Sequence, residues 1–282
     1  MIIDTHIHIW DTNKSSYGWL SGAPELLKRT YTIDELDAAR KTAGIDAGVF
    51  VQADVQMEDS LHMLEVARNS EWIKGVVSWL PLADTGWTAK LLEEKLLKDE
   101  YFVGVRHLIH DEKDPQWLLQ PAVIESLKIL AAHNIPYDVV GVLPEHIETI
   151  LKVTELVPDL QMVFDHLNAP PISSGAHYGR WGELMQEVAK NKNVYAKISG
   201  LGTVAGAQKF TAEELKPYIG FVLEHFGADH CFCGGDWPVS LLAKDYVYTW
   251  EVYKTVLSSL LSGEALASVY AGNAIGFYGL KL

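Results

Sequence analysis

The chain has 282 residues, with 23 Lys and Arg against 37 Asp and Glu, so its formal net charge is −14 at pH 7. This acidic excess argues against a nucleic-acid partner, which requires clustered basic residues, and against docking on an anionic membrane surface. With 48% apolar residues and no apolar run of the roughly 18 residues that a transmembrane helix needs, the composition predicts a soluble globular protein.

The chain has two cysteines, Cys231 and Cys233, which lie two residues apart in one apolar segment. This usage predicts no disulfide framework, and the first residues carry no charged leader. We therefore expect a cytoplasmic protein that acts on a small-molecule substrate. A homo-oligomeric state is left open by the sequence.

Short apolar runs rich in β-branched residues alternate along the chain with longer stretches of helical periodicity. The runs predict strands near residues 1–7, 47–53, 73–80, 102–108, 135–140, 160–165, 193–198 and 230–234. The other stretches predict helices near residues 33–43, 58–69, 88–98, 116–133, 144–156, 180–190, 212–225 and 246–261. Eight strands that alternate with helices indicate parallel pairing. We predict an α/β fold, a (β/α)8 TIM barrel, as one domain over residues 1–282; an open Rossmann sheet is disfavoured because no G-x-G-x-x-G follows the first strand.

Two long segments, residues 9–32 and 166–180, follow predicted strands. In a parallel barrel the segments after the strands build the active site, so we expect both at its mouth. Trp10, Trp19, Trp79 and Trp237 follow or end strands, and they either line a pocket there or pack in the core.

The strongest chemical signal is Asp4-Thr5-His6-Ile7-His8 at the end of the first strand. Side chains alternate along a strand, so the two imidazoles share one face about 7 Å apart. Such a pair can converge on one metal ion.

Two further motifs end later strands: Asp165-His166 ends the sixth, and Gly234-Gly235-Asp236 ends the eighth. His166 either faces the mouth or bonds a backbone carbonyl. A carboxylate beside a cationic or metal centre keeps a low pKa and can take a proton from water. Asp236 is therefore a candidate general base, with a turn-capping Asp as the alternative.

Basic residues lie in two apolar strands: Arg106 and His107 in the fourth, and Lys197 in the seventh. A buried Lys or Arg needs an anion nearby, which is either a structural carboxylate such as Asp165 or a substrate group. Gln52, at the end of the second strand, can hydrogen-bond a polar ligand.

These motifs together resemble the amidohydrolase superfamily, and within it the sugar-lactonase group that includes L-fuconolactonases, L-rhamnonolactonases and pyrone-dicarboxylate lactonases. The resemblance runs along the whole chain, through Asp4–Asp11, Gly104–His107, Asp165–Leu167, Tyr195–Leu201, Gly235–Val239 and Phe277–Leu280.

The resemblance implies a distorted (β/α)8 barrel that opens the lactone ring of a sugar acid or a similar small acid. The family's strand-one histidine pair, strand-four arginine, strand-six histidine and strand-eight aspartate correspond to His6 and His8, Arg106, His166 and Asp236. Taking the residues and the resemblance together, we expect Asp236, His166 and Arg106 to be catalytic and His6, His8 and Asp236 to bind a metal. As substrate contacts we expect Gln52, His107, Lys197 and Trp237. Zinc is the ion we expect first for two histidines and a carboxylate, and manganese second. Activity without a metal is left open, because some lactonases of this group work without a divalent ion.

The chain departs from the superfamily pattern at three points. Strand five, Ile135–Val140, has no histidine, no residue corresponds to a carbamylated lysine, and the usual Gly-Lys-Pro after the strand-six histidine is Asn168-Ala169-Pro170. We expect at most one metal. If the lysine of that Gly-Lys-Pro contacts substrate in relatives, the ligand of this chain differs from theirs. The alternative functions are a metal-dependent decarboxylase of the same superfamily and a non-catalytic small-ligand binder on the same scaffold.

Overall fold

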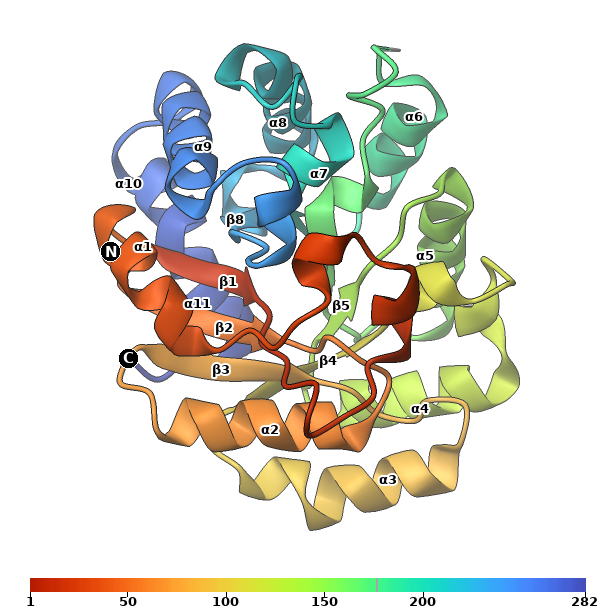
Figure 1. Ribbon diagram of the computed structural model, residues 1–282. Helices are drawn as coiled ribbons and strands as arrows, with labels where there is room; N and C mark the ends of the chain where they lie inside the picture. The colour runs from red at the N-terminus through yellow and green to blue at the C-terminus, as the bar shows by residue number, and fades with distance from the viewer. Residues whose placement is uncertain (176) are drawn as a thin grey trace.

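The computed structural model describes residues 1–175 and 177–282, and its centre is one parallel sheet of eight strands in chain order (Figure 1). The strands are β1 (Ile3–Ile7), β2 (Ala47–Val51), β3 (Ile73–Ser78), β4 (Phe102–His107), β5 (Tyr137–Val139), β6 (Met162–Phe164), β7 (Val194–Ile198) and β8 (Cys231–Cys233). All eight lie within the segments that the apolar runs predict. Their residues are buried on both faces almost throughout, as a parallel sheet covered by helices requires.

The sheet curls into a barrel that closes between its first and last strands. The Asp236 N–H donates to the His6 carbonyl at 2.7 Å, and the His8 N–H donates to the Trp237 carbonyl at 2.7 Å. These two bonds lie just beyond the carboxyl end of β8, so we call this place the β8–β1 seam. The predicted (β/α)8 TIM barrel is confirmed.

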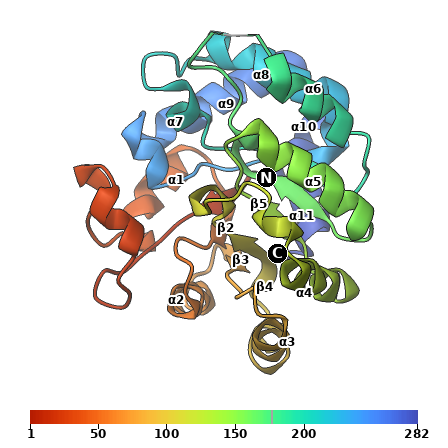
Figure 2. The ribbon, with the colours of Figure 1, turned by 90° about the vertical axis from the view of Figure 1, so that its right-hand side faces the viewer.

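Helices surround the strands (Figure 2). The predicted ones are α1 (Asp37–Thr42), α2 (Met57–Arg68), α3 (Thr85–Glu94), α4 (Pro121–Ala132), α5 (Pro144–Leu156), α6 (Gly179–Val188), α8 (Ala212–Phe226) and α9 (Tyr246–Leu260). Local sequence sets several of their first turns. Proline begins α4 and α5, Thr211 accepts a hydrogen bond from the Glu214 N–H at the start of α8, and Asp245 caps α9.

The sequence did not predict three short helices: α7 (Leu201–Ala205), α10 (Gly263–Ala267) and α11 (Asn273–Tyr278). Each has five or six residues, too few to show helical periodicity. From α11, Phe277 and Tyr278 pack against barrel residues such as Val163 and Phe232. This helix therefore packs its aromatic side chains against residues of the barrel strands.

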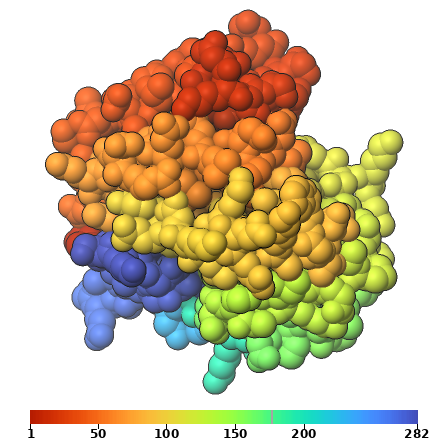
Figure 3. Space-filling model, turned by 90° about the horizontal axis from the view of Figure 1, so that it is seen from below, coloured from red at the N-terminus to blue at the C-terminus, as the bar shows by residue number. Residues whose placement is uncertain are grey.

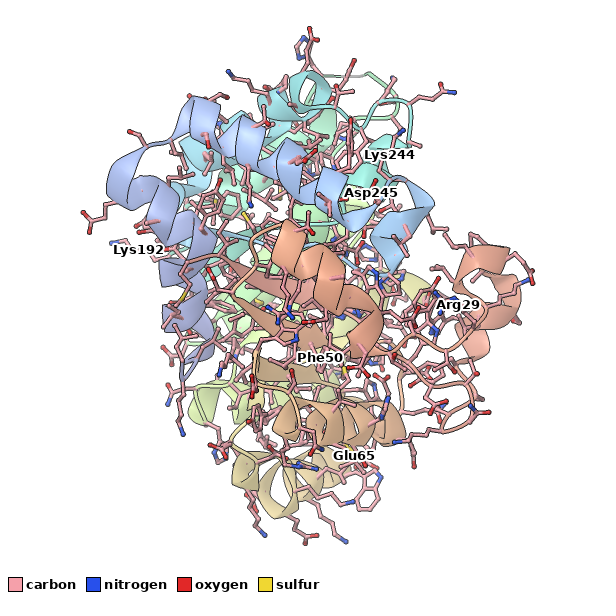
Figure 4. The ribbon with its side chains drawn as sticks, turned by 60° about the vertical axis from the view of Figure 1, so that its left-hand side comes forward. Arg29, Phe50, Glu65, Lys192, Lys244 and Asp245 are labelled. Atoms are coloured by element: carbon pink, nitrogen blue, oxygen red, sulfur yellow. The ribbon has the colours of Figure 1, made fainter. Side chains whose placement is uncertain are left out.

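The surrounding helices separate a buried sheet from an acidic surface. In Figure 4, Phe50 of β2 lies inside while Glu65 lies on the outer face of α2. Seen from below, the region of α2, α3 and α4 forms a continuous surface beside the C-terminal residues (Figure 3). Within the described ranges, no helix is both long enough and apolar enough to cross a membrane.

Candidate active site

A cavity of about 710 Å³ opens at the carboxyl ends of the strands. Both long segments line it: Trp10, Trp19 and Leu27 come from the β1–α1 segment, and the stretch after β6 adds residues 169–174 except Ile172. Figure 1 shows the β1–α1 segment in dark red beside the arrowheads of β1 and β2. Four candidate site residues also line the cavity: His8, Arg106, His166 and Asp236.

The two histidines of β1 present ring nitrogens to each other. The Nδ1 atom of His8 lies 2.7 Å from the Val51 carbonyl, which can only accept, so Nδ1 carries the proton and Nε2 keeps its lone pair. The Nδ1 atom of His6 lies 3.3 Å from Asp165 Oδ1, which favours the same tautomer. The two Nε2 atoms are 3.1 Å apart. Two lone pairs at that distance repel unless a cation lies between or beside them.

Asp236 brings a carboxylate to this nitrogen pair. Its Oδ1 atom lies 3.4 Å from His8 Nε2 and 3.7 Å from His6 Nε2. Its backbone is left-handed, with φ of 58°, a conformation that costs a non-glycine residue energy and recurs at functional sites. The seam hydrogen bond from the Asp236 N–H to His6 holds this conformation in place.

His166 approaches the same point from β6. His6, His166 and Asp236 each offer one ligand atom, and these atoms lie within 4.8 Å of one another. The Nδ1 atom of His166 lies 2.9 Å from Ser199 Oγ, which orients the ring. His166 begins a run of four residues with positive φ, from His166 to Ala169. Such a run is rare outside glycine and holds the chain over the barrel mouth.

A buried ionic network lies among the strands beside these ligands. The Lys197 ammonium lies 2.6 Å from Asp138 Oδ2 and 2.8 Å from Asp165 Oδ1, and all three side chains are fully buried. The Tyr278 hydroxyl also bonds the Asp138 carboxylate, at 2.8 Å to Oδ2. Lys197 therefore has the structural carboxylate partner that the sequence left as one alternative, and it does not line the cavity.

Arg106 joins this network to the cavity. Its Nη1 donates to Asp165 Oδ2 at 3.1 Å, its Nε donates to Gln52 Oε1 at 2.9 Å, and its Nη2 bonds the Gln52 carbonyl. Gln52 is fully buried and does not line the cavity, so it acts on the guanidinium. Nη1 also lies 3.3 Å from His6 Nε2.

Burial and these charges set the ionisation of the central groups. Burial holds the pKa of His6 well below its ordinary value and lowers that of His8, so both imidazoles are neutral. Burial opposes ionisation of Asp165, but Lys197, His6 and Arg106 hold its pKa well below the usual range. For Asp138, burial raises the pKa to about 6 despite Lys197.

None of the four expected substrate contacts lines the cavity: besides Gln52 and Lys197, His107 and Trp237 also lie away from it. The His107 ring stacks on Trp117 at 4.1 Å, accepts from Trp79 Nε1 and lies 2.8 Å from Glu112 Oε1. The Trp237 ring packs edge-on against Tyr31, 5.4 Å between centroids. The structure thus brings His6, His8, Arg106, His166 and Asp236 together, and leaves His107 and Trp237 outside this group.

Asp138 and His110 are two further residues near the site that no motif in the sequence marks. Asp138 pairs in register with Arg106 of β4, and His110 lines the cavity after β4. The signal for Asp138 is a lone carboxylate between Tyr137 and Val139 in a short buried strand, a place that requires a cationic partner.

The donor set fits a single divalent ion. Ligand atoms around tetrahedral zinc lie about 3.3 Å apart, since each bond is about 2.0–2.1 Å. The separations among His6 Nε2, His8 Nε2 and Asp236 Oδ1, 3.1 to 3.7 Å, match that spacing. The hydrogen bond from His8 to Val51 and the 3.3 Å contact of His6 with Asp165 are the kind that orient metal-binding imidazoles. Arg106 Nη1 competes for the lone pair of His6, so that contact has to lengthen for His6 to bind an ion.

Comparison with known proteins gives a consistent picture. The amidohydrolase family model matches residues 3–280. The chain is 31% identical over 279 residues to a protein of Burkholderia ambifaria named L-fucono-1,5-lactonase, covering 98% of this chain and 94% of that protein. A protein of Burkholderia multivorans with the same name is 26% identical over 297 residues, covering 99% of this chain and 96% of that one. A crystal structure of an amidohydrolase from Burkholderia multivorans with bound zinc has a TM-score of 0.89 at 26% identity and covers 100% of both chains. The chain belongs to the amidohydrolase family and is a hydrolase.

Proposed function

We propose that this hydrolase opens the lactone ring of a sugar acid or a similar small carboxylic acid. The observation that carries the proposal is the convergence of His6 Nε2, His8 Nε2 and Asp236 Oδ1, with distances of 3.1 to 3.7 Å, beside a cavity at the barrel mouth. The names of the relatives from two Burkholderia species support this reaction class.

Asp236 has the place of a general base. In lactone hydrolysis a water oxygen bonds to the carbonyl carbon, the ring C–O bond breaks, and the products are a carboxylic acid and an alcohol. The Asp236 carboxylate takes the proton from the attacking water and returns it to the ring oxygen as that bond breaks. General-base catalysis of this kind contributes typically about 10²–10⁴-fold.

Arg106 and His166 stabilise the charge that develops on the carbonyl oxygen. Both line the cavity, and Arg106 keeps one Nη2 N–H free of the hydrogen bonds described above. A well-placed donor to such an oxyanion is worth about 3–4 kcal/mol. A divalent ion held by His6, His8 and Asp236, zinc before manganese, would add Lewis-acid polarisation of the same carbonyl.

The test is acid release from a panel of lactones, followed with a pH indicator, for the wild type and for Asp236→Asn. We expect the variant to lose about 10²–10⁴-fold in kcat, because Asn keeps the shape but cannot accept the proton. Asp245→Asn is the matched control, since Asp245 is an exposed N-cap where Asn caps equally well (Figure 4). Release of CO₂ from aromatic acids would instead identify a decarboxylase, and no turnover at all would favour a binding protein.

A further inference from the structure

From the wall of the cavity we infer the chemical class of the substrate: an uncharged lactone whose ring carries an apolar substituent. The inference rests on the proposed function and narrows it, because that function includes polyhydroxylated and carboxylated lactones. It depends on the side chains above the reacting groups and on how the charge of Arg106 is already paired.

The wall of the cavity is mainly apolar. Aromatic and aliphatic side chains come from seven separate segments, and more than half of the lining residues are apolar. They include Trp19, Leu27, Val142, Pro170, Val204 and Val239. Val142 is 47% exposed, so a ligand in the cavity has apolar surface left to cover. Covering such surface is favourable in proportion to its area.

The same wall offers no free positive charge. Among the residues that the structure describes, Arg106 is the one lysine or arginine lining the cavity. Its charge is already paired with Asp165 at 3.1 Å, and Lys197 is buried between Asp138 and Asp165. Asp111, at the cavity wall, adds a negative charge. A substrate carboxylate above the reacting groups would lose water without gaining a cation, which is unfavourable.

Two hydroxyls of the wall already donate their hydrogen bonds within the protein. The Thr203 hydroxyl donates to the Gly200 carbonyl at 2.8 Å, and the Ser174 hydroxyl donates to the Pro171 carbonyl at 2.9 Å. The indole N–H of Trp19 has no hydrogen-bond partner among the described residues, which suits one acceptor atom on a substituent. A ring with a hydroxyl on every carbon would have to rely on these partly engaged hydroxyls, on His110, Asp111 and Ser173, and on the groups assigned to the reaction.

The size of the cavity agrees with a substituted ring. Cavities that hold drug-sized ligands measure about 300–1,000 Å³, and this one, at about 710 Å³, lies in the upper half of that range. A bare six-membered lactone is much smaller than such a ligand. The remaining volume, bounded by the apolar wall, is where the substituent lies.

The first experiment compares six-membered lactones that differ only in their substituents. The set is δ-valerolactone, its methyl, propyl and pentyl derivatives, a carboxypropyl derivative, and glucono-1,5-lactone, each assayed by pH indicator with wild-type enzyme. We expect kcat/KM to rise about fourfold per added methylene over the first few carbons. The carboxylated and polyhydroxylated lactones should fall at least tenfold below the propyl derivative.

The second experiment adds a cation to the wall. Ala169→Lys places an ammonium in the cavity beside His166, and Ala169→Met is the matched control with similar length and no charge. We expect the lysine variant to gain at least tenfold in kcat/KM for the carboxypropyl lactone and to lose activity on the propyl lactone, while Met does neither. Because Ala169 has a φ of 50°, Val142→Arg with Val142→Met is a second pair at a residue outside the positive-φ run.

The outcomes separate the two proposals. If wild-type enzyme hydrolyses the polyhydroxylated or the carboxylated lactone as fast as the propyl derivative, the apolar substrate class is overturned and lactone hydrolysis stands. If neither cationic variant changes the preference between charged and uncharged lactones, the wall does not set specificity and the inference is also wrong. If no lactone is hydrolysed by the wild type, the proposed function itself fails.

Discussion

Gly200 lies against the imidazole of His166 so closely that a Cβ atom at residue 200 would be 2.3 Å from Nδ1 and 2.8 Å from Cγ. Gly200 also has a φ of 58° and follows Ser199, whose hydroxyl contacts the same ring nitrogen. The backbone after β7 therefore fixes where the His166 ring can lie.

Replacing Gly200 by alanine should displace His166 and impair turnover. A displacement of about 1 Å at a reacting group can cost up to about 100-fold, so we expect kcat to fall by 10- to 100-fold. Gly206→Ala is the control, because Gly206 has a φ of 79° and nothing within 4 Å of the added Cβ. Both variants bear a similar backbone penalty in melting temperature, and only Gly200→Ala should lose activity. Equal losses of kcat in the two variants would contradict the role of this contact.

Arg106 and Lys197 should respond differently to replacement by methionine. Lys197 is the cation paired with Asp138, and breaking a buried pair costs about 3–5 kcal/mol. At about 2–4 °C per kcal/mol, Lys197→Met should melt roughly 6–20 °C lower. The cost will lie towards the lower end, because Asp138, whose pKa is about 6, can be protonated instead.

In Arg106→Met, Asp165 keeps Lys197 at 2.8 Å, so less stability is lost. We expect kcat/KM to fall at least tenfold instead, because the cavity loses an oxyanion donor. Thermal melting and steady-state kinetics on both variants check the contrast. Normal kinetics with a large drop in melting temperature for Arg106→Met would refute its assignment to the reaction.

The amount of bound metal should depend on the two histidines at the end of β1. Elemental analysis of His6→Ala and His8→Ala should find less zinc or manganese than in the wild type, since each variant removes one of three converging donors. His133→Ala, at the exposed end of α4, should keep the wild-type content. Stoichiometric metal in both β1 variants would show that the ligands are wrong. Active wild type free of metal would move the polarising role to Arg106 and the imidazoles.

Asp59 should make stability depend on pH. It is buried where the β2–α2 turn meets Tyr17, whose hydroxyl donates to Asp59 Oδ1 at 3.0 Å. Burial raises the pKa of this carboxyl to about 7, against about 3.9 in an unfolded chain. The folded state therefore binds more protons between these values, so this contribution to stability is complete below about pH 4 and is lost as the pH rises through 7.

The measurement compares the melting temperatures of the wild type and Asp59→Asn at pH 5 and pH 8. Asn does not titrate, so the advantage of the wild type over the variant should shrink as the pH rises. Other carboxyls with a raised pKa, such as Asp4 and Asp138, are present in both proteins, so their contributions cancel in the difference between the two melting temperatures. A difference that stays constant between the two pH values would show that Asp59 does not titrate in this range.

The sequence predicts the barrel well because its strands are short apolar runs and the eight predicted helices show helical periodicity, which α7, α10 and α11 are too short to do. The shared face of His6 and His8 can also be predicted from the sequence, since side chains alternate along a strand. The same alternation explains the position of His107: it follows Arg106 directly on β4, so when Arg106 faces the barrel interior His107 faces outward, onto Trp117.

Other features depend on the register between strands, which no single segment contains. In the sequence, Asp138 is a single polar residue in β5. Only the pairing of strands shows that Arg106 of β4 and Lys197 of β7 lie beside it. The position of Trp237 likewise depends on the left-handed backbone of Asp236, which turns the chain at the seam. Tertiary pairing, and not local preference, sets both.

The hydrogen bonds of the β8–β1 seam have a consequence for partly folded chains. The backbone N–H of Asp236 and the carbonyl of His6 form one of the two backbone hydrogen bonds of this seam, so Asp236 reaches the histidines of β1 only when the first and last strands meet. A chain with seven strands in place and the eighth detached would keep most of its helices and its far-ultraviolet circular dichroism, yet Asp236 would be missing from the site. Loss of activity on heating should therefore precede loss of helix, and the exchange rate of the Asp236 amide proton should report the opening that separates the two events.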